Sequence, residues 1–538
     1  MNRLIALSIL FLGSMQLWGQ ALDTEDPSSP PAVTYTDIHD FVETDGCCTL
    51  YPSMLAQGED GNIYGATTSG GVGYGNIFMI PPSGTFTNLY NFSANGLYPQ
   101  GGISLGTDGN FYGATYQGGT GHAGTLFQIT ASGTEKALYN FTNTTDGAYP
   151  RVPPVQAGDG NYYGTTANGT VAVLYQLTGS GTFKVMVTLA AQSYSPLLLA
   201  TDGNLYGTTL LGGTFGKGTI FKYSPGATTV TTLFNFQNEF SPTGPLIQGV
   251  DGKLYGTAST GGTGDGGAIF HITTGGTYKV IYNFSTTGAT DGRYPYGGVV
   301  QGSDNKLYGV ASTGGANSVG TLFNVSTSGS SFQVLYNFAT ATGSTPYSAL
   351  LLHTNGTIYG ITYTGGAHGY GCIYSVKASL KAFVKPLNKV SAKVGSSFGL
   401  LGQGFNTATG VTIGAGTATP TIKSDTYMTA KPVAGATTAQ VIVDEPSGNL
   451  STPLTFNITP TISSFSPASG PVGTVVVITG QSLTGATKVK FGGIAATSFT
   501  INSNTQVTAT VPTGAVTGKI KVTTAGGTAT SSTNFTVQ

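Results

Sequence analysis

Charge is the scarcest property of this sequence. Only 8% of its 538 residues are Asp, Glu, Lys or Arg, and the formal net charge is −1. Proteins that bind nucleic acid neutralise phosphates with clustered lysine and arginine, so the composition excludes nucleic acid as an expected partner. Helix-forming blocks are also almost absent, whereas the chain has 83 glycines and is 11% aromatic. These proportions predict an all-β protein with tight turns and a buried core.

Long apolar runs are missing except at the N-terminus. There, Arg3 precedes an apolar run from Leu4 to Trp18, and Gly19 and Ala21 are small residues in front of a cleavage site after Ala21. This is the pattern of a secretory signal peptide, and the run is too short to favour a membrane span. We therefore expect a signal peptide over 1–21, a linker over 22–33, and an exported mature chain without a transmembrane segment.

Patterns that mark catalytic or metal sites are missing as well. Glutamate occurs six times and most aspartates fall in turn motifs, so no pair of carboxylates suggests itself for glycoside hydrolysis. The five histidines form no His-Glu-x-x-His motif. A Gly-x-Ser-x-Gly pattern at 395–399 would need the strand-to-helix turn of an α/β fold, so we treat it as chance. We expect no catalytic residue, no metal ligand and no cofactor.

What the sequence has is a repeat. The motif Asp-Gly-Asn-x-Tyr-Gly or a close variant occurs seven times, at spacings of 48, 51, 43, 49, 53 and 51 residues. Strand-rich units with a period near 50 are typical of β-propeller blades, so seven units predict seven blades. The tyrosines of the structural repeat motif are Tyr64, Tyr112, Tyr163, Tyr206, Tyr255, Tyr308 and Tyr359.

One unit shows why the repeat predicts four strands. In the fifth unit, the segments 245–249, 254–258, 268–273 and 278–284 are short and apolar or alternating, and turn residues separate them. Asp251-Gly252 is a hairpin signal, so we interpret the aspartates as turn residues. The tyrosine that follows has two interpretations. It packs neighbouring blades together, or it belongs to a ring of exposed aromatics on one face.

The ends of the repeat region predict how the ring closes. The outer-strand motif, Leu-Tyr-Asn-Phe or similar, is degenerate in the seventh unit, whereas a copy, 35–41, precedes the first unit. An open ring would leave unpaired strand edges. We therefore expect a propeller over 34–384 that is closed by the N-terminal strand 35–41 in the seventh blade.

Three cysteines, Cys47, Cys48 and Cys372, are an odd number for an exported chain. Cys372 takes the position of Thr321 at the start of the third strand, beside the expected closing strand, and Cys47 and Cys48 follow that strand closely. A disulfide from Cys372 to Cys47 or Cys48 would therefore staple the ring. A vicinal Cys47–Cys48 bond and three free thiols are the alternatives.

The C-terminal third lacks the 50-residue period and contains two similar segments, 385–458 and 459–538. The second has the motifs Ser466 to Thr474, Ile478 to Leu483 and Val489 to Gly493. These motifs resemble the IPT/TIG domain, an immunoglobulin-like β-sandwich, and the first segment is a degenerate copy. The repeats of the propeller region resemble the GloVer-type tandem repeats of secreted bacterial proteins. This resemblance implies export to the periplasm, the cell surface or the medium of a bacterium.

The function expected from these features is binding. We expect a non-enzymatic surface or extracellular protein for binding or adhesion, with a polysaccharide or another surface protein as its partner, because sugars stack on aromatic rings and need little charge. The binding residues are unknown at this stage. Two alternatives stay open: an extracellular carbohydrate-active enzyme that uses the propeller channel, and a structural component of the envelope or matrix.

Overall fold

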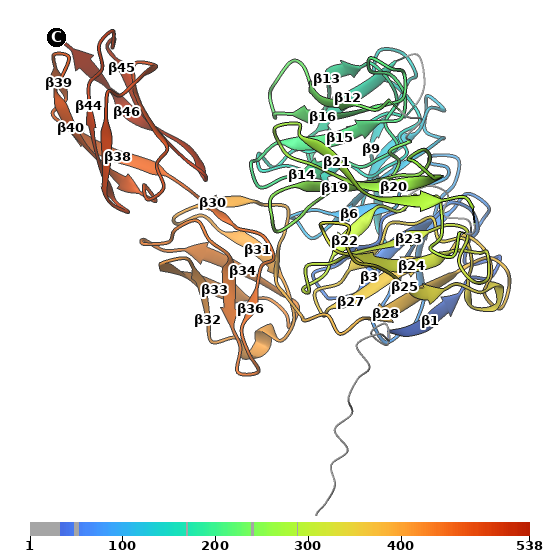
Figure 1. Cartoon of the computed structure of the whole chain (residues 1–538). Coiled ribbons are helices and arrows are strands. Elements are labelled where there is room, and N and C mark those ends of the chain that lie inside the picture. Colours follow the sequence, from blue (N-terminus) through green and yellow to red (C-terminus); the bar gives the residue numbers. More distant parts are fainter. Residues whose placement is uncertain (1–32, 48–52, 168–170, 238–240, 288) are drawn as a thin grey trace, which may run out of the picture.

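Short antiparallel strands dominate the whole chain, as its glycine-rich turns require. The computed structural model describes residues 33–47, 53–167, 171–237, 241–287 and 289–538. The expected signal peptide, nearly all of the linker and Cys48 lie outside these residues. Within them, seven four-stranded sheets form a β-propeller, and two β-sandwich modules follow (Figure 1). No helix in the described part of the chain is long and apolar enough to cross a membrane.

The first six blades each consist of four consecutive strands. Blade 1 contains β2 (Ala56–Gln57), β3 (Ile63–Thr67), β4 (Asn76–Ile80) and β5 (Thr87–Asn91); blade 2 contains β6 (Ile103–Leu105), β7 (Phe111–Thr115), β8 (Thr125–Ile129) and β9 (Glu135–Asn140); and blade 3 contains β10 (Val155–Gln156), β11 (Tyr162–Thr165), β12 (Ala172–Leu177) and β13 (Phe183–Leu189). Blade 4 contains β14 (Leu198–Leu199), β15 (Leu205–Thr209), β16 (Thr219–Tyr223) and β17 (Thr231–Asn235); blade 5 contains β18 (Ile247–Gln248), β19 (Leu254–Ala258), β20 (Asp265–Ile272) and β21 (Tyr278–Ser285); and blade 6 contains β22 (Val299–Gln301), β23 (Leu307–Ala311), β24 (Thr321–Val325) and β25 (Phe332–Asn337).

The seventh blade combines both ends of the propeller. The 3-10 turn η1 (Thr340–Thr342) precedes its inner strands, β26 (Leu351–Leu352), β27 (Thr357–Ile361) and β28 (Cys372–Lys377). Its outer strand is β1 (Thr34–Asp40), which pairs antiparallel with β28. The N-terminal strand thereby covers the edge that β28 would otherwise expose.

Stacked aromatic rings join the outer strands of neighbouring blades. Tyr139 stacks on Phe183 at 3.8 Å between blades 2 and 3, and Tyr282 stacks on Phe332 at 4.1 Å between blades 5 and 6. The closing strand continues this series in both directions. Tyr35 stacks on Tyr336 of blade 6 at 4.1 Å, and His39 stacks on Phe86, just before the outer strand of blade 1, at 4.3 Å.

A glutamine of the innermost strand makes a second recurring contact. Its side-chain oxygen accepts a hydrogen bond from the backbone N–H just after the inner strand of the preceding blade, in the pairs Gln156–Thr107, Gln248–Thr201 and Gln301–Val250. Gln57 of blade 1 makes the same contact with Thr354 of blade 7, at 3.0 Å, and also donates to the Thr354 hydroxyl at 2.8 Å. The same type of bond therefore joins consecutive blades and closes the ring.

The first module rests on the propeller. Its main sheet has the order β29 (Lys385–Pro386), β31 (Phe398–Leu401), β34 (Tyr427–Pro432), β33 (Gly416–Ile422), β32 (Gly410–Ile413), β35 (Val441–Asp444) and β36 (Leu450–Ser451), and the parallel pair β30 (Ser391–Lys393) and β37 (Asn457–Thr459) and the 3-10 turn η2 (Phe405–Thr407) complete it. Ser424 and Thr426 donate to the carbonyl of Glu59 in blade 1, and Asn457 donates to the carbonyl of Thr201 in blade 4. These contacts lie at the turn between the first two strands of a blade, so we call this side of the propeller the turn face.

The C-terminal module is a two-sheet sandwich that lies farther from the propeller (Figure 1, red). One sheet has the order β38 (Thr461–Ser466), β40 (Val475–Gln481), β44 (Gln506–Thr510) and β43 (Phe499–Ser503), and the other has the order β39 (Ser469–Gly470), β46 (Gly527–Val537), β45 (Gly518–Thr524), β41 (Lys488–Phe491) and β42 (Ile494–Ala495). Val476, Phe491, Val522 and Phe535 belong to its buried core. Alternating strand residues thus point into the sandwich or out to solvent.

The closing glutamine yields a prediction about stability. We expect Gln57→Ala to lower the free energy of unfolding by about 1–3 kcal/mol, because the buried N–H of Thr354 loses its acceptor and the Thr354 hydroxyl loses one of its donors. Gln301→Ala is the matched control, since its partner Val250 is 47% exposed and water can replace the bond. Urea unfolding of the full chain measures both changes. Equal losses for the two variants would show that the closing bond has no special weight.

Candidate functional site

The seven motif tyrosines lie in the core, each with 0–2% of its surface exposed. Six of them donate a hydrogen bond of 2.7–2.8 Å from the hydroxyl to the motif aspartate four residues earlier. The same aspartates accept a backbone N–H within the turn, as Asp60 does from Asn62 at 3.0 Å. The motif therefore builds the turn and the packing between blades, and its rings are not a ligand surface.

The predicted disulfide staple is wrong. Cys372 is a buried free thiol, whereas Cys47 is disulfide-bonded. The register itself is as the staple required, because Asp40 at the end of β1 lies opposite Cys372. Beyond Phe41, however, the chain crosses to blade 1, where the backbone of Cys47 forms an isolated antiparallel β-bridge with the backbone of Ser69. The thiol of Cys372 points into its own blade and donates to the carbonyl of Thr342 at 3.3 Å.

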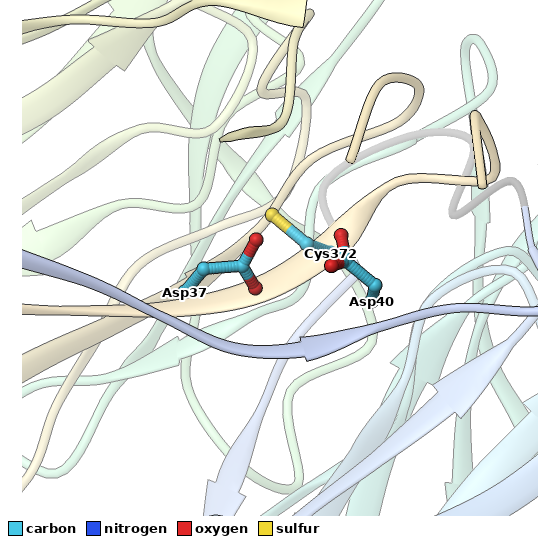
Figure 2. A group of neighbouring side chains, drawn as sticks. All are labelled: Asp37, Asp40 and Cys372. Carbon is cyan, nitrogen blue, oxygen red and sulfur yellow. The ribbon is translucent and has the colours of Figure 1, made fainter. Parts of the chain in front are cut away.

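Ring closure brings three ligand-type side chains together: Asp37, Asp40 and Cys372 (Figure 2). One atom of each lies within 4.8 Å of the other two. Residues three apart on a regular strand point to opposite faces, but β1 has a bulge between Asp37 and His39, which turns Asp37 and Asp40 to the same side. Sequence analysis missed this group because Cys372 lies more than 300 residues from the two aspartates along the chain.

The electrostatics of this group favour protons over a metal ion. Burial, together with the neighbouring Asp40 carboxylate, raises the pKa of Asp37 to about 6, and burial raises the pKa of the Cys372 thiol to about 12. Metal ligands must be deprotonated, so the protonated Cys372 thiol competes with metal binding, and the Asp37 carboxyl does so below about pH 6. Asp40 also accepts the N–H of Ala367 at 2.9 Å, as Asn140 and Asn235 accept a loop N–H in their own blades. We therefore interpret the group as part of the closure.

This interpretation predicts a pH dependence. Because the folded pKa of Asp37 exceeds its ordinary value of 3.8, the folded state holds the proton more tightly, and the resulting stability is complete below about pH 4 and lost as the pH rises through 6. The shift of about two units bounds the effect below about 3 kcal/mol, and solvent screening of a half-exposed group reduces it. We expect Asp37→Asn to be about 1 kcal/mol more stable than wild type at pH 8 and equal to it at pH 4, by urea unfolding. An unchanged pH slope in the variant would contradict this account.

Burial of Cys372 yields a second prediction. A thiol reagent at pH 8 should label the peptide containing Cys372 only after unfolding, because the side chain is fully buried and its pKa is about 12. Cys372→Thr should change the stability by less than about 1 kcal/mol, since threonine occupies the equivalent position at Thr125, Thr219 and Thr321. Rapid labelling of native protein would show that the thiol is accessible and that this position is not part of the packed core.

The face opposite the turn face carries the exposed aromatic surface of the propeller. The loops between the second and third strands and between blades meet there, and we call it the loop face. Tyr347 lies between Tyr296 and Tyr363 at ring distances of 5.0 and 5.5 Å, and all three are partly exposed. Similar pairs occur elsewhere on this face, at 6.3 Å for Tyr74 with Tyr98 and at 5.2 Å for Tyr116 with Tyr149.

The backbone of these loops repeats from blade to blade. The residue before a proline has positive φ in four of them, at Tyr98 (62°), Tyr149 (55°), Tyr294 (60°) and Thr345 (56°). The N–H of each bonds to the adjacent strand loop, as Tyr149 does to Ala123 at 2.7 Å. Left-handed backbone is costly for a residue with a side chain. Sequence reasoning assigned these tyrosines no role because only the motif tyrosines recur at a fixed offset.

Both arginines of the expected mature chain also lie on the loop face. The guanidinium of Arg151 lies over the rings of Tyr116 and Tyr194, at 4.4 and 4.7 Å, and donates to Gln100 at 2.6 Å. Arg293 lies 5.6 Å from the ring of Tyr294. Cation–π contacts of this kind hold the rings in place and add hydrogen-bond donors beside them.

Comparison with known families decides the affiliation of the chain. The model of the Gloeobacter/Verrucomicrobia repeat matches residues 28–173, 143–302 and 285–422, which together span most of the chain. The chain belongs to the Gloeobacter/Verrucomicrobia repeat family. The IPT/TIG domain model matches residues 460–537, as the second C-terminal segment predicted, and confirms that resemblance. No curated protein matches the sequence.

Solved structures similar to this repeat-family protein are distant. A streptogramin B lyase structure has 15% identity and a TM-score of 0.46, and the match covers 65% of this chain and 98% of the other. A fungal alcohol oxidase in complex with copper has 13% identity and a TM-score of 0.43, with 91% and 98% covered. SGBP-B from a xyloglucan utilisation locus of Bacteroides uniformis has 20% identity and a TM-score of 0.16, with 28% and 48% covered. Similarity at this level carries no inference about function.

Proposed function

We propose that this chain is an exported, non-enzymatic binding protein of the bacterial surface or medium, and that its propeller holds carbohydrate on the loop face. The repeat family and the IPT/TIG domain indicate a surface or binding protein. The partly exposed tyrosines of the loop face carry the finer proposal, above all Tyr347 between Tyr296 and Tyr363. Aromatic rings with hydroxyl groups offer both the apolar face and the hydrogen bonds that a sugar ring requires.

The position of the first module supports the choice of face. It contacts blades 1 and 4 on the turn face, and Gln403 and Asn388 extend its contacts to Thr354 in blade 7 and to the carbonyl of Leu105 in blade 2. A ligand on the turn face would compete with this module. The loop face lies on the other side and keeps its rings exposed.

The carboxylates of the loop face support binding rather than hydrolysis. Asp146 accepts hydrogen bonds from Tyr139 and from Thr142, both at 2.8 Å, and its pKa is lowered by these and neighbouring bonds in spite of its burial. Asp291 accepts from Tyr282 at 2.7 Å, and Asp45 contacts His39 at 2.9 Å. These aspartates accept hydrogen bonds that stabilise the loops, and the lowered pKa of Asp146 is the opposite of what the proton-donating carboxyl group of glycoside hydrolysis requires.

Loss of the central ring tests the proposal. A glycan array with the full mature chain identifies a neutral ligand, and titration calorimetry then compares wild type with Tyr347→Ala. We expect at least a tenfold loss of affinity, because truncation of an anchoring aromatic residue costs about 2 kcal/mol. The control is Tyr90→Ala on the outer strand of blade 1, which also removes a half-exposed tyrosine and should change the affinity less than twofold.

Two outcomes would replace the proposal. Release of new reducing ends from the bound glycan would indicate a carbohydrate-active enzyme. Failure to bind any glycan on the array, by a chain with the expected far-ultraviolet spectrum, would favour a structural component of the envelope or matrix.

A further inference from the structure

The charged side chains of the C-terminal module are all positive, and the function proposed for the propeller does not use them. Residues 460–538 contain four lysines and no aspartate or glutamate. All four lysines belong to β41 and β45, which are neighbours in one sheet: Lys488, Lys490, Lys519 and Lys521. The residues that alternate with them, among them Val489 and Val522, are buried in the core. The lysines therefore project from the outer face of this sheet.

The register places two of these charges directly opposite each other. Lys490 pairs with Lys521 across β41 and β45, and Lys488 lies two residues from Lys490 on the same face. Like charges at opposite positions of an antiparallel pair destabilise a sheet. The module has no acidic side chain to offset this repulsion. A bound anion would supply the missing negative charge.

These lysines line a shallow hollow of about 470 Å³. Its lining consists of three lysines and four threonines: Lys488, Lys490, Lys521, Thr487, Thr523, Thr528 and Thr530. Lys488, Lys521, Thr528 and Thr530 are exposed. The lining combines point charges with hydrogen-bonding hydroxyls, along a sheet that is open at its surface.

We propose that this lysine face binds an anionic polysaccharide. The carboxylate groups of the polysaccharide would pair with the lysines, and its hydroxyl groups would form hydrogen bonds with the threonines. The lining contains no aromatic ring, so it offers no stacking platform for single-stranded nucleic acid. It also contains no large apolar side chain that could insert into a membrane. Lysine is a point charge that suits dispersed carboxylates. The site lies in a different module from the tyrosines of the loop face and stands independently of them.

A charge-matched pair of variants tests this proposal in the full chain. The probe is alginate, a polymer of uronic acids, with neutral dextran, a DNA duplex and vesicles of phosphatidylglycerol as comparisons. The variant Lys490→Gln/Lys521→Gln removes two charges from the lysine face. The control Lys423→Gln/Lys431→Gln removes two exposed lysines from the first module and gives the same net charge.

We expect wild type to bind alginate and not dextran, with an affinity that falls as salt increases. Lys490→Gln/Lys521→Gln should lose at least tenfold in affinity and the control less than twofold. The melting temperature of the lysine-face variant should equal or exceed that of wild type, because repulsion is removed. Equal losses in both variants, tighter binding to DNA or vesicles, or no binding of wild type to alginate would overturn the proposal.

Discussion

The pairing of β1 with β28 is the constraint on which the rest of the propeller depends. Every other blade has four consecutive strands, whereas the seventh takes its outer strand from the opposite end of the ring. Tyr35 and His39 of this strand continue the aromatic stacking to blades 6 and 1, and Gln57 repeats the bond between inner strands. The closing interface thus has the same contacts as the interfaces between the other blades: stacked aromatic rings between outer strands and a glutamine hydrogen bond between inner strands. This repetition lets a ring of short two- to eight-residue strands avoid a free edge.

The seventh blade also carries departures from the repeat, and they follow from its composite origin. Where blades 2, 4 and 6 pair an Asn of the outer strand with a Thr of the third strand, this blade pairs Asp40 with Cys372. His353 in its turn is buried, donates to the carbonyl of Gly61 in blade 1 at 3.0 Å, and accepts the N–H of Asn355. Burial lowers the pKa of His353, so the neutral ring makes this contact, and at the other side of the blade the pKa of Asp37 is raised to about 6. Titratable groups thus gather at the interface where the ring closes.

The sequence predicted the fold because its repeated features are local. Each Asp-Gly turn and the tyrosine behind it lie within a few residues, and seven copies at one period left little freedom in architecture. The disulfide prediction was wrong because the chain leaves blade 7 after Phe41, and the backbone of Cys47 pairs with that of Ser69 in blade 1. No local sequence pattern indicates this change of blade. The docking of the first module was equally out of reach, since Ser424, Thr426 and Asn457 bond to backbone carbonyls, which have no sequence signature.

The loop tyrosines could not be assigned from sequence for a related reason, and their geometry is informative about function. The fold needs a left-handed residue before proline at these corners, and glycine or asparagine would hold it at lower cost. Tyrosine in that conformation at Tyr98, Tyr149 and Tyr294 stores conformational energy of about 1 kcal/mol or more at each position. Contacts between rings, such as Tyr116 with Tyr149 at 5.2 Å, offset this cost, and the rings stay partly exposed. The carbohydrate ligand proposed for the loop face would stack on the exposed part of these rings and so add contacts that the propeller alone does not supply.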